Sequence, residues 1–439
     1  MRHHTTPLPQ PVFSEPRFNE GSFTADPSHE AIPHPSDAEL YRELGNALKK
    51  NVVAFDKSRI ADDAVFPLGD AYGARGPDEI IAIKKAGQVS FHVIGDSGAT
   101  NDGKYQHELH VSDQLTADFH SGPVASRPAF LYSLGDVVYD FGEAPYYYDQ
   151  FYEPYRNYPA PIFAIPGNHD SFVVPGTAPD DEPLKIFGRN FCAQQHEITA
   201  EAGSLHRTAM TQPGVYFTLD VPFVRIIGLF SNALEDPGLI SDQNGHWPGV
   251  PRHQLNFLKA QLNRIKAEKF AGAVLFAMHH PPFTYRSPKS GGGTHAGSTE
   301  MLREIDRICA EAGVYPHAVL SGHAHNYQRY TRIVQLGAEK HEVPFVVCGC
   351  GGHNVSVLAK ASEEPSFGDR VDHLDPNPAV TTGGLTLEKY DDRNYGYLKI
   401  NVDAQTLRIA FHHVDETSLT QSRYDLVSID LATHRKVAN

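Results

Sequence analysis

The feature that most constrains the fold is a rhythm of short apolar runs, each followed by a turn residue and a polar group. The runs lie at 91–94, 130–134, 162–165, 274–278, 318–321 and 345–348. Segments with helical spacing separate them, such as 253–265, where leucines and an isoleucine recur every three or four residues. Short β-branched or aromatic runs that alternate with helices predict an α/β layered sheet.

Polar residues follow five of these runs. The five blocks are Gly95-Asp96-Ser97-Gly98, Gly135-Asp136-Val137-Val138-Tyr139, Gly167-Asn168-His169-Asp170, His279-His280-Pro281 and Gly322-His323-Ala324-His325. Residues beyond the carboxyl ends of strands converge in an open α/β sheet, even when they are far apart in the chain. Glycine before a ligand lets the backbone turn sharply as it leaves the strand. Because carboxylate, amide and imidazole groups bind metals, the pattern predicts a metal site.

Charge and composition limit the classes of partner that the chain can bind. The formal net charge of −15 repels nucleic-acid backbones and acidic membrane surfaces, so no nucleic-acid polymer is expected as a partner. A small phosphorylated substrate would need a local positive centre, which again indicates metal ions. The longest apolar runs are far shorter than the roughly 20 residues that span a bilayer, so no membrane crossing is expected. The chain does not indicate an oligomeric state.

The two ends suggest the domain limits and the compartment. Residues 1–85 are interpreted as an N-terminal extension, a proline-rich arm followed by a helix near 37–50. Residues 86–415 form the predicted catalytic domain, with paired strands expected at 397–402 and 407–414. Residues 416–439 are interpreted as a tail that has room for one added strand at 424–429. The N-terminus lacks an apolar signal region, so cytoplasm is the default compartment, or periplasm or secretion if a leader was removed.

The five blocks carry a family resemblance. Read in order as GD-x-G, GD-xx-Y, GNH-[DE], H-x-P and GH-x-H, they resemble the metal-binding blocks of purple acid phosphatases, a branch of the calcineurin-like metallophosphoesterases. The resemblance covers roughly residues 89–415. It implies a metallophosphoesterase-type α/β/β/α sandwich with two central mixed sheets, and an acid phosphatase-like hydrolase. One block alone is weak evidence, whereas five in the family order are specific.

The resemblance also implies a set of metal ligands. The wider superfamily usually has a histidine where this chain has Gly98, and Tyr139 supplies a replacement, since a phenolate is a hard anionic donor suited to trivalent iron. The implied Fe(III) ligands are Asp96, Tyr139 and His325. The implied ligands of a divalent Fe, Zn or Mn ion are Asn168, His279 and His323, with Asp136 bridging the two metals.

The implied reaction is hydrolysis of phosphate monoesters by a metal-bound or metal-bridging hydroxide. His169 is interpreted as a catalytic group that binds the phosphate or protonates the leaving group, with Asp170 orienting its ring. His280 and His295 are candidate substrate contacts. Packing beside the site is the alternative for His280, and a solvated loop position is the alternative for His295.

Two other functions stay open at this point. A phosphodiesterase, for example one acting on nucleotides, could use the same metal core, because the outer pocket decides between monoesters and diesters. A noncatalytic interaction scaffold typically loses several ligands or the histidine of the GNH block, and this chain has lost none of them. The aromatic residues between 146 and 155 have the spacing of a helix face that packs on the sheet.

Overall fold

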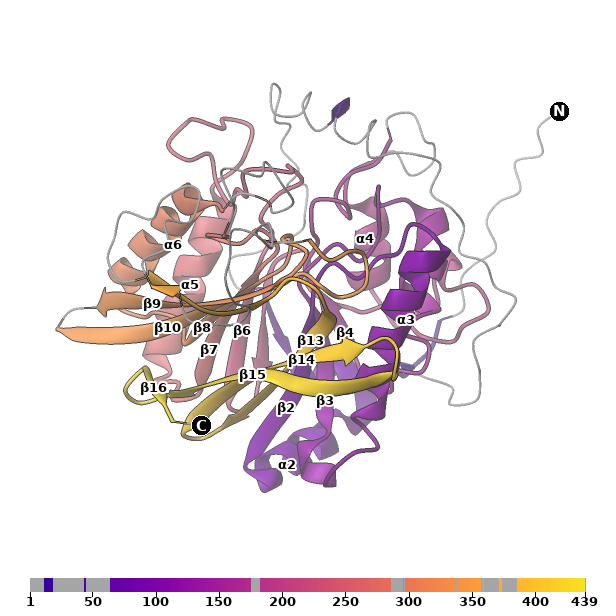
Figure 1. The fold of residues 1–439 in the computed structure, drawn as a ribbon, viewed down its shortest axis with the longest axis horizontal. Coiled ribbons are helices and arrows are strands. Elements are labelled where there is room, and N and C mark those ends of the chain that lie inside the picture. The colour runs from indigo at the N-terminus through magenta and orange to yellow at the C-terminus, as the bar shows by residue number, and fades with distance from the viewer. Residues whose placement is uncertain are drawn as a thin grey trace.

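A computed structural model describes residues 12–18, 43–44, 64–174, 182–285, 295, 297–336, 338–356, 358, 371–372 and 385–438. Two mixed β-sheets lie between helices (Figure 1), which confirms the predicted layered α/β sandwich. Nearly all of the helix predicted near 37–50 lies outside the described residues.

The larger sheet has nine strands in the order β1-β5-β6-β7-β8-β10-β9-β12-β11. Their bounds are β1 Val65–Pro67, β5 Phe217–Val221, β6 Val224–Leu229, β7 Ala273–Met278, β8 Ala318–Ser321, β9 Tyr327–Leu336, β10 Glu339–Cys348, β11 Val371–Asp372 and β12 Leu385–Asp391. Strands β6, β7, β8 and β10 run parallel to one another. Helices α5 (His253–Ala267) and α6 (Thr299–Ala312) pack together beside this sheet.

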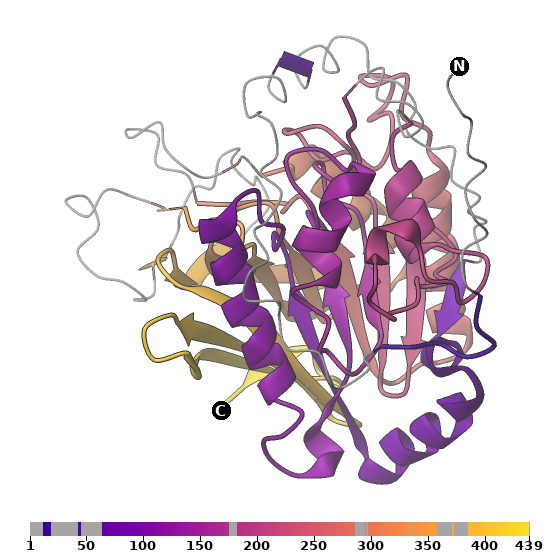
Figure 2. The same ribbon diagram turned by 90° about the vertical axis from the view of Figure 1, so that its right-hand side faces the viewer.

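The smaller sheet has seven strands in the order β16-β15-β14-β13-β2-β3-β4. Their bounds are β2 Gln88–Ile94, β3 Pro128–Ser133, β4 Ile162–Ala164, β13 Tyr395–Asp403, β14 Thr406–Asp415, β15 Thr420–Asp430 and β16 Arg435–Val437. Strands β2, β3 and β4 are parallel, and the others are antiparallel. Helix α3 (Asp102–Ala117) contacts β13 and β14 and runs in front of the strands in Figure 2.

Short helices connect the strands. They are η1 Leu68–Arg75, α2 Gly76–Ala86, η2 Val124–Ser126, η3 Ala144–Tyr146, the π-helical turn η4 Tyr148–Tyr152, α4 Lys185–Phe191 and η5 Ala200–Ala202. The strands predicted near the C-terminus are confirmed as β13, β14 and β15. Strand β1 joins the larger sheet from within the predicted N-terminal extension, and the division at residue 86 stays a prediction.

Aromatic side chains fill the space between the two sheets. The ring of Tyr327 on β9 stacks on the ring of Phe411 on β14, with centroids 4.0 Å apart. The rings of Tyr132 on β3 and Phe217 on β5 also stack, with centroids 6.3 Å apart. Burial of such large apolar surfaces holds the sheets face to face.

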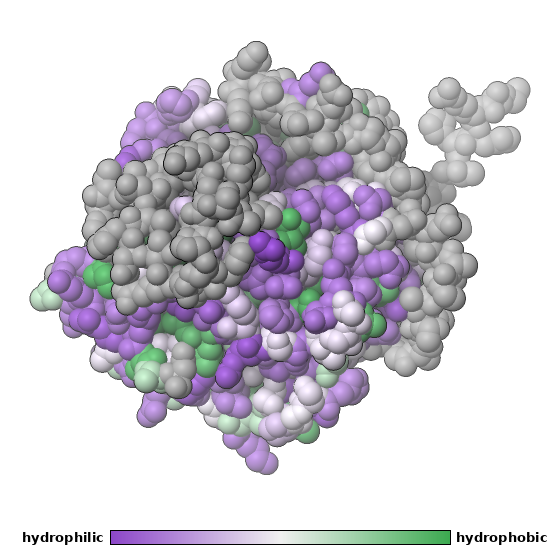
Figure 3. All heavy atoms as spheres, viewed as in Figure 1, coloured by the Kyte–Doolittle hydropathy of each residue, from purple (hydrophilic) through white to green (hydrophobic). Residues whose placement is uncertain are grey.

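The outer surface is mostly hydrophilic on the face in Figure 3, as expected for a chain with a net charge of −15. Among the described helices, none has both the length and the apolar character needed to cross a membrane.

One buried ion pair joins the two sheets. The guanidinium of Arg329 on β9 donates to both carboxylate oxygens of Asp425 on β15, at 2.6 and 3.1 Å, and the Tyr327 hydroxyl donates to the same carboxylate at 2.7 Å. Arg329 and Asp425 are only 9% and 8% exposed. A bidentate pair of this kind fixes the relative position of the strands as well as adding energy.

We predict that Asp425→Asn lowers the free energy of unfolding by about 3 kcal/mol, because it leaves the buried Arg329 charge without its close partner. Burial raises the pKa of Asp425, but Arg329 lowers it further, so the net shift is downward. The carboxylate therefore stabilises the fold above pH ~4, and the difference from wild type should shrink as the pH falls below that value.

Urea unfolding monitored by circular dichroism measures this difference. Lys259→Ala is a suitable control, since it breaks an exposed pair with Glu311 (50% and 38% exposed), and exposed pairs contribute little to stability. Equal losses in the two variants would contradict the role given to Asp425.

Candidate metal centre

The predicted ligands, and the predicted catalytic residue His169, follow the carboxyl ends of five parallel strands. Strand β2 leads to Asp96, β3 to Asp136 and Tyr139, β4 to Asn168 and His169, β7 to His279, and β8 to His323 and His325. Three of these strands belong to the smaller sheet and two to the larger. The side chains converge where the two sheets meet, as the strand-end argument predicts.

One group of side chains consists of Asp96, Tyr139 and His325. The Tyr139 hydroxyl lies 3.1 Å from Asp96 Oδ1 and 3.3 Å from His325 Nε2. His325 Nε2 is 3.4 Å from the same Asp96 oxygen. The structure therefore brings together the three residues predicted to bind Fe(III).

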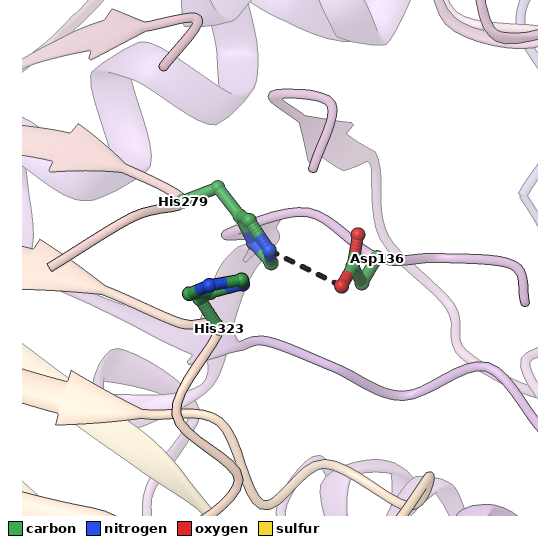
Figure 4. Close-up of side chains that lie close together, drawn as sticks. All are labelled: Asp136, His279 and His323. Atoms are coloured by element: carbon green, nitrogen blue, oxygen red, sulfur yellow. Dashed lines mark ion pairs between the residues drawn. The ribbon is translucent and has the colours of Figure 1, made fainter. Parts of the chain in front are cut away.

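A second group consists of Asp136, Asn168, His279 and His323. Ligand atoms of Asp136, His279 and His323 all lie within 4.8 Å of one another (Figure 4). His279 Nε2 is 3.1 Å from Asp136 Oδ2 and 2.9 Å from Asn168 Oδ1. Asp136 also interacts with the Tyr139 hydroxyl, so it lies between the two groups as expected of a bridging ligand.

The second group has the chemistry of a cation site. His279 Nδ1 lies 2.9 Å from the Leu134 carbonyl, which can only accept, so the proton of a neutral ring sits on Nδ1. Nε2 then presents a lone pair to the oxygens of Asp136 and Asn168, and this repulsion is relieved by a cation or a proton. His323 Nε2 is buried without a hydrogen-bond partner in the described part of the chain, and Asp136 Oδ2 is a buried carboxylate oxygen that lies against His279 Nε2. Such groups are costly unless an ion binds them.

The pKa shifts agree with this interpretation. Burial lowers the pKa of His279, but the Asp136 carboxylate outweighs it and the pKa rises to about 9. Burial and the carboxylates of Asp136 and Asp96 raise the pKa of Tyr139 well above its usual value. A phenolate at Tyr139 therefore requires a strong positive charge nearby, and a bound metal ion can provide it. The residues present fit two metal ions.

Backbone strain is concentrated at the ligands. Asp96, Asp136 and His323 have positive φ angles of 58°, 54° and 66°. Such conformations cost of order 1–3 kcal/mol in non-glycine residues and cluster at functional sites. Each carboxylate also holds a neighbouring loop, since Asp96 Oδ2 accepts from His323 N at 2.8 Å and Asp136 Oδ1 from His169 N at 3.0 Å.

Gly98 explains why the first block has no third-position histidine. A Cβ atom at this position would lie 2.6 Å from the Val137 carbonyl oxygen and 2.8 Å from Gln150 Oε1. Gln150 in turn bonds both the backbone N–H and the carbonyl of Tyr139, at 2.8 and 2.7 Å. The absence of a side chain at Gly98 lets the β3 loop approach, and the same loop delivers Tyr139.

The contacts of His169 and Asp170 differ from the predicted pairing of these two residues. His169 Nδ1 is 2.7 Å from the Asp140 carbonyl oxygen, so this carbonyl orients the ring. The Asp170 carboxylate accepts instead from three backbone N–H groups, those of Gly167 (2.8 Å), Val137 (2.9 Å) and Val138 (3.1 Å). The prediction that Asp170 orients the His169 ring is wrong, because the ring nitrogen Nδ1 faces the Asp140 carbonyl while Asp170 holds backbone N–H groups.

Burial and Asp136 raise the pKa of Asp170 to about 7, although the backbone donors lower it. Asp170 thus joins the β3 and β4 loops behind the ligands. A direct catalytic role for it stays a prediction.

The two candidate substrate contacts differ. His280 is fully buried, with Nδ1 2.8 Å from Ser231 Oγ and Nε2 2.7 Å from the Leu234 carbonyl oxygen. Both ring nitrogens have protein partners, which favours the packing alternative. The centroid of the His295 ring lies 4.0 Å from that of the His323 ring, so His295 is directly beside the second group of ligands.

Sequence reasoning missed three nearby residues. The ring of His353 stacks on Tyr139 with centroids 3.5 Å apart, and Lys104 Nζ lies 2.8 Å from His353 Nε2. Glu235 contacts both Asn168 and His295. Lys104 and Glu235 follow no predicted strand end, whereas His353 follows the predicted run at 345–348 after a glycine-rich turn, which was the one available signal.

Together these features define a metallohydrolase built on an α/β/β/α sandwich. Residues 89–327 match the family model of calcineurin-like phosphoesterases, which is more than half of the chain, and the chain belongs to this family. Family membership indicates metal-dependent hydrolysis of phosphoesters at a dinuclear site.

Two solved structures resemble the chain more distantly. One is GAP50, the anchor in the inner membrane complex of Plasmodium, with 12% identity and a TM-score of 0.45, over 76% of this chain and 88% of that chain. The other is PhoD, with 13% identity and a TM-score of 0.45, over 80% of this chain and 72% of that chain. A comparison with curated proteins found no match.

We predict that Gly98→Ala lowers the free energy of unfolding by about 1–3 kcal/mol, because the added methyl group overlaps the Val137 carbonyl. The displaced loop should also reduce metal binding at Tyr139. Chemical unfolding and elemental analysis measure the two effects. Gly103→Ala is the control, since its Cβ would meet only Asn101 Oδ1, at 3.4 Å. Wild-type stability in Gly98→Ala would refute the crowding argument.

Proposed function

We propose that the protein is a purple acid phosphatase-like phosphomonoesterase. Fe(III) would be held by Asp96, Tyr139 and His325, and a divalent Fe, Zn or Mn ion by Asn168, His279 and His323, with Asp136 between them. The observation that carries the proposal is the position of the Tyr139 hydroxyl, 3.1 Å from Asp96 and 3.3 Å from His325. A phenolate among such donors suits a hard trivalent ion.

The charge of the site supports a phosphorylated substrate. When bound, two metal ions would supply Lewis acidity, lower the pKa of water and neutralise the phosphate charge. The protein ligands contribute three negative charges, from Asp96, Asp136 and Tyr139. A trivalent and a divalent ion would therefore leave the centre positive by about two charges, in a chain whose net charge is −15.

His169 is the residue best placed for proton transfer. The Asp140 carbonyl accepts from Nδ1 at 2.7 Å, which assigns proton exchange with the substrate to Nε2. The ring is partly exposed and lies 4.2 Å from the ring of Tyr139. In its protonated form His169 would donate to the leaving-group oxygen, and in its neutral form it would accept a hydrogen bond.

We predict that Tyr139→Phe abolishes any visible phenolate-to-iron absorption band while the far-ultraviolet circular dichroism stays unchanged. The substitution removes only the oxygen that would bind iron. Elemental analysis, the visible spectrum and rates with an aryl phosphate monoester and diester provide the measurements. A purple or pink colour that survives in the variant would contradict Tyr139 ligation. If the wild-type protein hydrolysed the diester faster than the monoester, that result would refute the monoesterase assignment.

We predict that His169→Ala retains both metals but slows turnover about 10²–10⁴-fold, the range for lost general acid–base catalysis. The rate on an aryl phosphate and the metal content are measured on the same sample. Loss of metal from this variant would instead show that His169 supports the ligands. His246→Ala removes a histidine with little burial beside Trp247 and is a control for histidine loss as such.

A further inference from the structure

We infer that Glu235 is a positioning residue that turns the Asn168 amide oxygen toward the second metal site and holds His295 beside it. The inference rests on the metal centre of the proposed function. It concerns a residue outside the predicted ligand blocks, on the loop between β6 and α5.

The first step concerns the two ends of the Asn168 amide. Asn168 Nδ2 donates to Glu235 Oε2 at 3.3 Å, while Oδ1 lies 2.9 Å from His279 Nε2. A carboxylate can only accept, so Glu235 selects the amide nitrogen as its neighbour. Oδ1 is left facing the ligand group, and this oxygen is the end of an amide that binds a cation.

The opposite orientation would block the site. A flipped Asn168 would point its NH₂ group at the ligand group, and an amide nitrogen does not ligate a cation. Glu235 therefore favours the orientation that presents the amide oxygen to a metal ion.

The second step concerns His295. The other carboxylate oxygen of Glu235, Oε1, lies 3.3 Å from His295 Nδ1. The His295 ring lies 4.0 Å from the ring of His323 and 5.7 Å from that of His325. One carboxylate thus contacts a predicted ligand through one oxygen and a histidine beside the ligands through the other.

The third step concerns the loop that presents Glu235. The Leu234 carbonyl accepts from His280 Nε2 at 2.7 Å. Further along the loop, Leu239 N donates to Ser231 O at 2.8 Å, and Gly238 N donates to Ser298 Oγ at 2.7 Å. His280 is therefore an anchor for this loop, which accounts for its burial next to His279.

The expected effect is a loss of metal affinity. Outer-shell partners of metal ligands typically change affinity or activity 10–100-fold when they are removed. Glu235→Ala should weaken binding of the second metal ion by that factor. Glu235→Gln keeps an oxygen that can accept from Asn168 and should restore most of the affinity.

The test is a titration of the full-length metal-free protein with Mn²⁺, followed by electron paramagnetic resonance. His295→Gln should bind Mn²⁺ within about twofold of wild type and should raise KM for an aryl phosphate more than it lowers kcat. Glu311→Ala removes an equal charge from an exposed position on α6 and controls for net charge. Thermal unfolding confirms that each variant is folded.

Wild-type affinity in Glu235→Ala would overturn the inference. Equal losses in Glu235→Ala and Glu235→Gln would also overturn it, since they would show that charge matters and the acceptor position does not. Failure of the proposed function looks different, because a wild-type protein that binds two Mn²⁺ ions without hydrolysing the ester would refute that function. The contrast between the Ala and Gln variants would still decide the role of Glu235.

Discussion

The burial of two carboxylates, Asp96 and Asp136, is the constraint on which the rest of the centre depends. Each accepts a backbone N–H from the loop of another strand, so each joins two strand ends that are distant in the sequence. Each also faces phenol or imidazole groups at 3.1–3.4 Å. Buried charge is stable only when it is paired, and the pairing draws five loops to one point.

The close approach of these loops depends on small residues at the same places. Gly98 leaves room for the Val137 carbonyl, and a Cβ at Gly167 would lie 2.1 Å from Asp136 Oδ1. The glycines that mark the sequence blocks are therefore required by the contacts that the ligands make. This is why a pattern of glycine followed by a ligand, repeated at strand ends, carried most of the functional information in the sequence.

The sequence predicted the parts of the structure that local pattern determines. The runs at 91–94, 162–165 and 318–321 correspond to β2, β4 and β8, and residues that follow these strands do converge. The pattern did not predict β1 or β5, and the aromatic stretch near 146–155 contains a π-helical turn in place of a regular helix face. Pairing between distant strands decides such features, and no local periodicity encodes it.

The residues that the sequence did not reveal share a physical reason. Glu235 and His353 come from loops that reach the centre through tertiary packing, and Lys104 projects from the start of α3. Each touches a predicted ligand, or a group stacked on one, without belonging to one of the five recognised blocks. The Asp170 contact was mispredicted for a related reason, since adjacency to His169 in sequence does not determine which donors meet a buried carboxylate.

The same features that prepare the centre for metal lower the stability of the metal-free chain. Three ligands have strained backbones, and His323 Nε2 lacks a hydrogen bond within the described structure. A cation that binds only the folded state recovers this free energy, so metal affinity and folding stability are linked. A residue such as Glu235, which holds an amide in its metal-binding orientation, adds to the affinity because that amide does not have to reorient when the metal binds.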